Sequence, residues 1–361
     1  MATPPTDLLH LPAAQAARLI ALGLLDDATE ALTRLGASDD NEALHDFRVA
    51  IRRLRSTLRA YKGLLRGSVR KKQRNQLGDL ARATNAGRDA EVQLGWLRGQ
   101  VERLTPRERT GLRWLEMRLE ERVKDEYAQV DARIRKDFAK VSQRLRRRLG
   151  VYEQEVRTDG ETPATLAAVA AAELRREAAD LTSRLEGVSS PEDAKTAHTA
   201  RIAAKRVRYL LEPIAPQLPD TGAAALVRRL KGVQDRFGEL ADSHQFEEAL
   251  ASALGEAAAE RARRVLDESL EPTEGAPSSA KRGGRDPRAG IIAVAKLVRV
   301  RRDTVFERIG EWLGPNGGAA DLSREIEGVA TSLTSTGGPP PPLAPGDVDA
   351  RRRWRAKDRA R

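Results

Sequence analysis

The 361-residue sequence contains no cysteine, and this absence excludes several kinds of site. Disulfides, thiolate zinc sites and iron–sulfur clusters all require cysteine. Only four histidines are present, and none has another at a metal-ligand spacing such as His-x-x-x-His; they are His10, His45, His198 and His244. We therefore expect neither a metal nor another cofactor.

Aromatic residues and long apolar runs are also scarce. Aromatics make up 4% of the chain, whereas 40% is hydrophobic and 32% is charged. Alanine, leucine, arginine and glutamate dominate, which is typical of helical proteins, so an all-α fold is expected. No apolar run approaches the ~20 residues of a membrane span, and the first residues lack the basic region of a signal peptide. The sequence therefore predicts a cytoplasmic protein without a membrane partner.

One motif with a histidine and several arginines occurs twice. The first copy runs from His45 to Arg55 (HDFRVAIRRLR) and the second from His198 to Arg208 (HTARIAAKRVR), so the two histidines lie 153 residues apart. Asp89 and Asp242, further downstream, keep the same offset of 153 residues. Agreement in register over this length indicates an internal duplication.

Apolar residues at spacings of three and four predict helices through most of the chain. The longest stripe, from Leu112 to Leu149, predicts one continuous helix, and Thr105 and Glu108 have the spacing of a capping box at its start. We interpret Asp89 and Asp242 as helix N-caps. The predicted helices cover residues 12–36, 38–66, 69–86, a stretch from about 89, 105–149, 163–187, 190–213, 221–237, 242–270, 288–313 and 319–334.

The duplication divides the chain into two helical-bundle repeats, residues 1–157 and 158–336. Within the second repeat, residues 271–287 are rich in Gly, Pro, Ser, Lys and Arg and are predicted to be a mobile linker. Residues 337–361 are rich in proline and then in arginine, which predicts a disordered basic tail.

Positive charge is concentrated in a few segments. Residues 46–74 hold eleven Lys or Arg against Asp46 alone, residues 199–231 hold seven against two acids, and residues 351–361 hold seven against one. The net charge of the whole chain is only +11, so the remainder is acidic. Such placement indicates a polyanionic partner.

The basic residues of each motif fall on one helix face at 100° per residue. In the first copy this face carries His45, Arg48, Arg52, Arg55, Arg59 and Lys62, beside an apolar face of Phe47, Ile51, Leu54, Leu58, Tyr61 and Leu65. In the second copy it carries His198, Arg201, Lys205 and Arg208. Like charges at this spacing repel each other, so we expect an anion along each ladder. Arginine forks bind phosphate oxygens, and a ladder rising ~5 Å per turn can follow a chain of phosphates.

The candidate binding residues therefore come from both halves of the chain. The first half contributes His45, Arg48, Arg52, Arg53, Arg55, Arg59 and Lys62, with Lys71, Lys72 and Arg74 as a second wall. The second half contributes His198, Arg201, Lys205, Arg206 and Arg208, with Arg228, Arg229 and Lys231 as its second wall. The two histidines either contact the ligand or brace the fold.

The repeated pattern resembles the two signature helices of the CHAD family, the conserved-histidine α-helical domain. The resemblance covers residues 10–336 and rests on His45-x-x-Arg48-x-x-x-Arg52-Arg53-x-Arg55 and on its second copy, which ends in Arg208-Tyr209. It implies two antiparallel four-helix bundles, related by a pseudo-twofold axis, around a basic central cavity. It also implies binding of inorganic polyphosphate and association with polyphosphate granules.

Two features bear on the kind of member that this resemblance implies. The chain has no Glu-x-Glu-x-Lys start of a triphosphate-tunnel domain, which is often fused to this family, so it resembles a stand-alone member. The second half has Ala241 where the first half has Arg88, which departs from the repeat at that point.

Other functions are also compatible with basic helices. Nucleic-acid binding would use the same faces and the tail, although the helices lack interleaved aromatics for base stacking and a helix-turn-helix signature. An enzyme would need His45 or His198 as a phosphoryl acceptor, yet the sequence shows no carboxylate pair for Mg²⁺ beside the ladder and no Walker loop. We therefore expect a non-catalytic polyphosphate-binding protein, with non-specific nucleic-acid binding as the alternative.

Overall fold

The computed structural model of the protein describes residues 7–35, 42–151, 163–270, 286–314 and 317–336. In these segments the regular structure is helical and contains no strand, which confirms the all-α prediction. The α-helices are α1 (Ala13–Arg34), α2 (Ala43–Ala60), α3 (Lys71–Ala83), α4 (Asn85–Arg98), α5 (Arg109–Gly150), α6 (Leu166–Glu186), α7 (Ala194–Leu211), α8 (Ala223–Leu270), α9 (Arg288–Leu313) and α10 (Gly318–Thr336).

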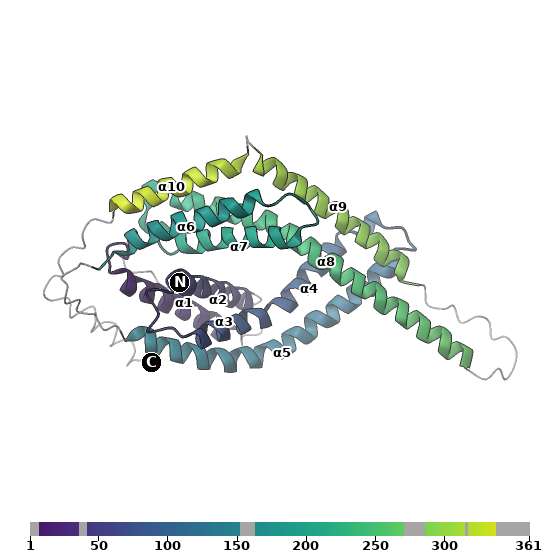
Figure 1. Cartoon of the computed structure of the whole chain (residues 1–361). Coiled ribbons are helices and arrows are strands. Elements are labelled where there is room, and N and C mark those ends of the chain that lie inside the picture. Colours follow the sequence, from purple (N-terminus) through teal and green to yellow (C-terminus); the bar gives the residue numbers. More distant parts are fainter. Residues whose placement is uncertain (1–6, 36–41, 152–162, 271–285, 315–316, 337–361) are drawn as a thin grey trace.

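The helices form an elongated molecule with a lower and an upper part (Figure 1). The lower part contains α1, α2, α3 and one end of α5, and the upper part contains α6, α7, α10 and the start of α8. Towards one end of the molecule α4, α5, α8 and α9 converge, and α5 there contacts both α4 and α9. None of the described helices combines the length and the apolar character that crossing a membrane requires.

Two hydrophobic cores hold this arrangement together. The larger core includes residues of α1, α2, α3, α6, α7 and α10, and the smaller one is centred on α4. Three long helices, α5, α8 and α9, contribute to both cores. Since each core draws on both predicted repeats, the cores do not follow the boundary between residues 157 and 158. The internal duplication itself stays a prediction.

The apolar face predicted for the first motif is buried as expected. Phe47, Ile51, Leu54, Leu58, Tyr61 and Leu65 are each at most 2% exposed. Phe47 also packs edge-on against Phe138 of α5, with ring centroids 5.2 Å apart. This burial fixes the rotation of α2, so that its basic residues lie outside the core.

The predicted long helix is confirmed, but it begins four residues later than expected. α5 runs for 42 residues, and Thr105 and Glu108 form the capping box, with the Thr105 amide donating to Glu108 Oε2 over 2.9 Å and the Glu108 amide donating to Thr105 Oγ1 over 3.4 Å. The helix begins at Arg109, so the box stands just ahead of it.

The break predicted between residues 237 and 242 is wrong, because α8 is one helix of 48 residues. Gly238 lies inside it with open space around its Cα. A glycine within a helix costs only about 1 kcal/mol, and burial of Phe237, Leu240 and Phe246 on either side outweighs that cost.

Three other predicted segments concern residues that are mostly or wholly outside the described ones: the junction at 158–165, the linker at 271–287 and the tail at 337–361. Where the structure does describe this junction, backbone hydrogen bonds connect it to the first repeat. The Leu166 amide donates to Leu11 O over 2.9 Å, and the Ala13 amide donates to Ala164 O over the same distance.

Candidate anion-binding site

The two motif helices contact each other where the lower and upper parts meet (Figure 1). Arg53 of α2 donates from Nε to Glu212 Oε2, just beyond α7, over 2.7 Å. Arg208 of α7 lies 3.1 Å from the other oxygen of the same carboxylate. The fold therefore brings the two predicted ladders together, and one arginine from each shares the carboxylate of Glu212.

A polar pocket of about 180 Å³ lies between α2, α4 and α8. It is lined by His45, Arg48 and Arg52 from α2, by Arg88, Asp89, Val92 and Gln93 from α4, and by Asp242 and Gln245 from α8. Gln245 Nε2 donates to Asp89 Oδ2 over 3.0 Å, which positions one of the two carboxylates. The lining includes three arginines and two aspartates, and one of these arginines, Arg88, also pairs with Glu91 over 3.2 Å.

Three ladder residues near this pocket have no carboxylate partner. Among the described residues, no Asp or Glu oxygen lies within 4.0 Å of a charged nitrogen of Arg52, Arg201 or Lys205. The Nε atoms of Arg52 and Arg201 are buried and have no hydrogen-bond partner in the described part of the chain. A buried N–H donor without an acceptor lowers the stability of the fold, unless a bound ligand accepts its hydrogen bond.

Asp242 acts electrostatically on Arg201 and Lys205, and it is only half-exposed. Burial raises the pKa of its carboxyl above the ordinary value, Arg201 lowers it, and the like charge of Asp89 raises it again. A single carboxylate shared in this way leaves the cations around it with a net positive charge.

The histidines stand at the N-terminal end of each ladder. His45 and His198 are both exposed, and His45 lines the pocket. Partial burial, Arg201 and Lys205 hold the pKa of the His198 imidazole below its usual range. His198 is therefore mostly neutral near pH 7 and adds little charge to the site.

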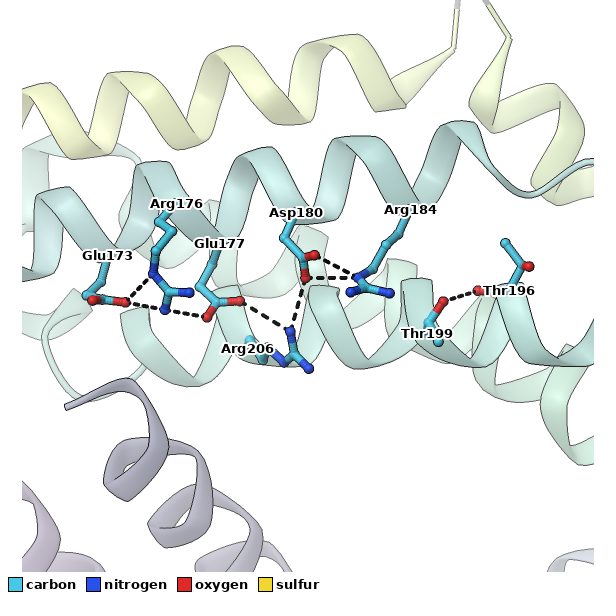
Figure 2. Close-up of polar contacts among 8 residues, drawn as sticks. All are labelled: Glu173, Arg176, Glu177, Asp180, Arg184, Thr196, Thr199 and Arg206. Carbon is cyan, nitrogen blue, oxygen red and sulfur yellow. Dashed lines mark hydrogen bonds and ion pairs between the residues drawn. The ribbon is translucent and has the colours of Figure 1, made fainter. Parts of the chain in front are cut away.

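Other predicted ladder residues are occupied by acids of the fold. Figure 2 shows Arg206 reaching from α7 to α6, where it lies 3.0 Å from Asp180 and 3.7 Å from Glu177. Glu177 is buried, and Arg176 also donates to it over 2.8 Å. Arg206 consequently joins α6 to α7, and its charge is largely compensated before any ligand binds.

The remaining basic residues of the first ladder lie at the C-terminal end of α2 and just beyond it. Arg55, Arg59 and Lys62 are exposed. The Arg55 guanidinium packs over Gly78 of α3, since a Cβ on that glycine would lie 3.7 Å from Arg55 Nη2. These residues extend the basic surface away from the pocket.

Of the residues predicted as second walls, some are exposed and others make contacts within the fold. Lys71, Lys72 and Arg228 are exposed. Arg74 donates to Val69 O over 3.0 Å, Lys231 pairs with Asp235 over 2.9 Å, and Arg229 bonds Glu325 and Gly318 O of α10. The structure thus does not bring the second walls to the pocket, and three of their members make contacts within the fold.

The site also contains residues that the sequence analysis did not include. Arg88, Gln93 and Gln245 line the pocket, and Arg301 acts on Asp242 from α9 while its guanidinium stacks 5.6 Å from the Trp96 ring centroid. The signal for Arg88 was its place beside Asp89 in the downstream repeat.

The interpretation of the two aspartates as N-caps is wrong. Asp89 lies within α4 and Asp242 near the middle of α8. Neither is at a helix start, because α4 begins at Asn85 and α8 continues through the expected break. Both side chains face the pocket instead.

Comparison with known proteins agrees with this architecture. No curated protein sequence matches the chain. The fold is similar to the crystal structure of the CHAD domain from the plant Ricinus communis, with a TM-score of 0.56 and 16% identity over 87% of this chain and 91% of that one. It is also similar to PptA from Streptomyces chartreusis, with a TM-score of 0.54 and 14% identity over 83% of this chain and 99% of that one. The family model of the CHAD domain matches residues 20–251, which include both motif helices and the pocket, and the chain therefore belongs to the CHAD family.

Proposed function

We propose that the protein binds inorganic polyphosphate, without turning it over, along the facing basic surfaces of α2 and α7. The observation that carries this proposal is that three cations, Arg52, Arg201 and Lys205, have no carboxylate partner in the described part of the chain. Membership of the CHAD family, which is linked to polyphosphate, supports the same ligand class.

The physical argument rests on compensation of charge. The fold pairs Arg206 with acids of α6, and Arg53 and Arg208 share the carboxylate of Glu212. Among the described residues, it places no carboxylate within 4.0 Å of Arg52, Arg201 or Lys205. Half-buried cations are destabilising without a counter-charge. A polymer with one negative charge at each phosphate supplies that charge at regular intervals, and it releases its own counterions on binding.

The test is a double charge reversal, Arg52→Glu with Arg201→Glu. Two lost charge-assisted hydrogen bonds predict at least a ~100-fold loss of affinity for long-chain polyphosphate in titration calorimetry. The matched control is Lys140→Glu with Arg144→Glu on the exposed side of α5, which makes the same change in net charge away from the site. Unchanged affinity in a folded Arg52/Arg201 variant would contradict the proposal.

Competition separates this function from the nucleic-acid alternative. Titrations with duplex and single-stranded DNA, each at several salt concentrations, should show weaker binding than polyphosphate at equal phosphate concentration. Equal or tighter binding of DNA, lost in the same double variant, would favour the alternative.

Localisation follows from the same binding. We propose that the protein resides in the cytoplasm and associates with polyphosphate granules. A fluorescent fusion should accumulate on granules, and the Arg52/Arg201 variant should be dispersed. Persistent granule association of that variant would show that another surface is responsible.

A further inference from the structure

Lys205 is surrounded by other cations, and it has no carboxylate partner among the described residues. It lies near the middle of α7 with its side chain half-buried. Arg201 and Arg208 act on it from the same helix, and Arg52 acts on it from α2. No described carboxylate oxygen lies within 4.0 Å of its Nζ, so the ammonium is not neutralised by the fold.

Charged residues on the neighbouring helices do not neutralise Lys205. From α8, Asp242 attracts the ammonium, but it is shared with Arg201 and Arg301. From α6, Glu177 and Asp180 face Arg206 and not Lys205. His198, on the same helix, is held mostly neutral near pH 7, because burial and these cations lower its pKa.

Burial and the three arginines lower the pKa of Lys205 from 10.5 to about 7. At neutral pH the free protein therefore contains both protonated and neutral Lys205. A polyanion at the site adds the missing counter-charge and favours the protonated form. Arginines cannot respond in this way, because they stay charged throughout.

We propose that Lys205 takes up one proton from solvent when the polyanion binds, so that binding at this site is linked to pH. This inference rests on the proposed function. The proton passes from buffer or water to Nζ, which becomes an ammonium that donates to phosphate oxygens, and no covalent bond to the ligand forms.

The linkage has a defined direction and size. Uptake should be less than one proton per site at pH 7 and should grow towards one as the pH rises, since the neutral fraction of the free protein grows with pH. Above pH 7 the affinity should fall by up to ~10-fold per pH unit until the pKa of Lys205 in the complex is reached. Burial and the neighbouring cations lower the pKa of His198, so this histidine does not contribute above pH 7.

Calorimetry in two phosphate-free buffers with different ionisation enthalpies measures the uptake directly. We would titrate wild-type protein with polyphosphate of defined length at pH 8 and compare Lys205→Arg, which keeps the charge and cannot titrate. Wild type should show a buffer-dependent enthalpy that corresponds to uptake of up to one proton, and Lys205→Arg should bind without it. Lys231→Arg, a like substitution at an exposed and paired lysine of α8, should behave as wild type.

The outcomes separate this inference from the proposed function. Binding with no buffer dependence in wild type, or equal uptake in Lys205→Arg, overturns the proton linkage and leaves polyphosphate binding standing. Absence of binding overturns both. A second measurement needs no ligand: with side-chain-labelled lysine, the NMR signal that disappears in Lys205→Arg should titrate near pH 7, and titration near pH 10 would overturn the inference.

Discussion

Arg53 in α2 and Glu212, immediately after α7, form an ion pair of 2.7 Å that joins the two predicted repeats of the chain. Their side chains are 28% and 13% exposed, so both are substantially shielded from water. Glu212 is also 3.1 Å from Arg208. Replacement of Glu212 by Gln should therefore leave two half-buried arginines without a counter-charge.

We expect Glu212→Gln to lower the free energy of unfolding by roughly 1–3 kcal/mol, because a charged hydrogen-bond partner of two arginines is lost. Urea denaturation measures this change. Glu248→Gln, on an exposed part of α8, is the control and should change stability by less than ~0.5 kcal/mol. A similar effect of both substitutions would show that the inter-repeat pair is not stabilising.

Lys205 should destabilise the folded protein at neutral pH. Its pKa is lower in the folded state, about 7, than in the unfolded chain. Between these two values the unfolded chain binds more protons, so the stability contributed by this group rises with pH.

Lys205→Met should thus raise the free energy of unfolding by roughly 1–3 kcal/mol at pH 7, and the gain should shrink towards pH 10. Urea denaturation of both proteins at several pH values provides the measurement. A gain that does not depend on pH would point to packing of the methionine instead of removal of charge.

The first turns of α5 and α9 cross at two glycines. A Cβ on Gly290 would lie 2.0 Å from Glu108 O, and one on Gly111 would lie 2.3 Å from Pro287 O. These neighbours are backbone atoms, which cannot turn away as a flexible side chain can.

Gly290→Ala should lower the free energy of unfolding by more than ~2 kcal/mol, because the helices must separate to admit the methyl group. Gly255→Ala is the matched control, since Gly255 lies inside α8 with open space around it. That substitution should raise stability by about 0.5–1 kcal/mol through its higher helix propensity. Thermal denaturation distinguishes the two, and equal shifts would contradict the close crossing.

Arg302 of α9 is the most buried arginine or lysine among the described residues, with its side chain 8% exposed. It lies 3.2 Å from Glu247 of α8, 3.2 Å from Glu192 and 2.8 Å from Asp303. Arg302→Met keeps the length of the side chain but leaves these carboxylates facing one another.

We expect Arg302→Met to cost roughly 3 kcal/mol of stability, as for removal of one partner from a buried ionic cluster. Arg299→Met removes a more exposed cation that lies 3.7 Å from the same Glu247 and should cost less than ~1 kcal/mol. Chemical denaturation of the two variants tests this order, and a reversed order would be inconsistent with the burial of Arg302.

The helical fold and the core side of the motif could be predicted from sequence because both depend on local spacing. The stripe from Phe47 to Leu65 is buried residue for residue. What spacing could not show is which cations would be neutralised. Arg53 and Arg206 occupy matching positions in the repeat, yet Arg53 pairs with Glu212 and Arg206 with Asp180 of α6. Glu212 is far from the first motif in the sequence, and Asp180 belongs to a different helix from Arg206. Only the tertiary structure therefore identifies these partners.

The continuation of α8 through the predicted break also could not be inferred from local sequence patterns. Gly238 resembles a break in the sequence, and long-range burial of Phe237 and Phe246 overrides it. Because α8 continues, Asp242 comes from the middle of a helix and faces Asp89 across the pocket. The same misjudged break accounts for its assignment as a cap.

The passage of α5, α8 and α9 through both hydrophobic cores has a consequence for motion. Two domains joined by a linker can open and close independently, but here three rigid rods would have to bend together. The cores should therefore melt as one cooperative unit, with the slowest amide protons of each exchanging at the same free energy of opening. A chain-like ligand would then bind where α2 and α7 meet without closure of one half of the molecule upon the other.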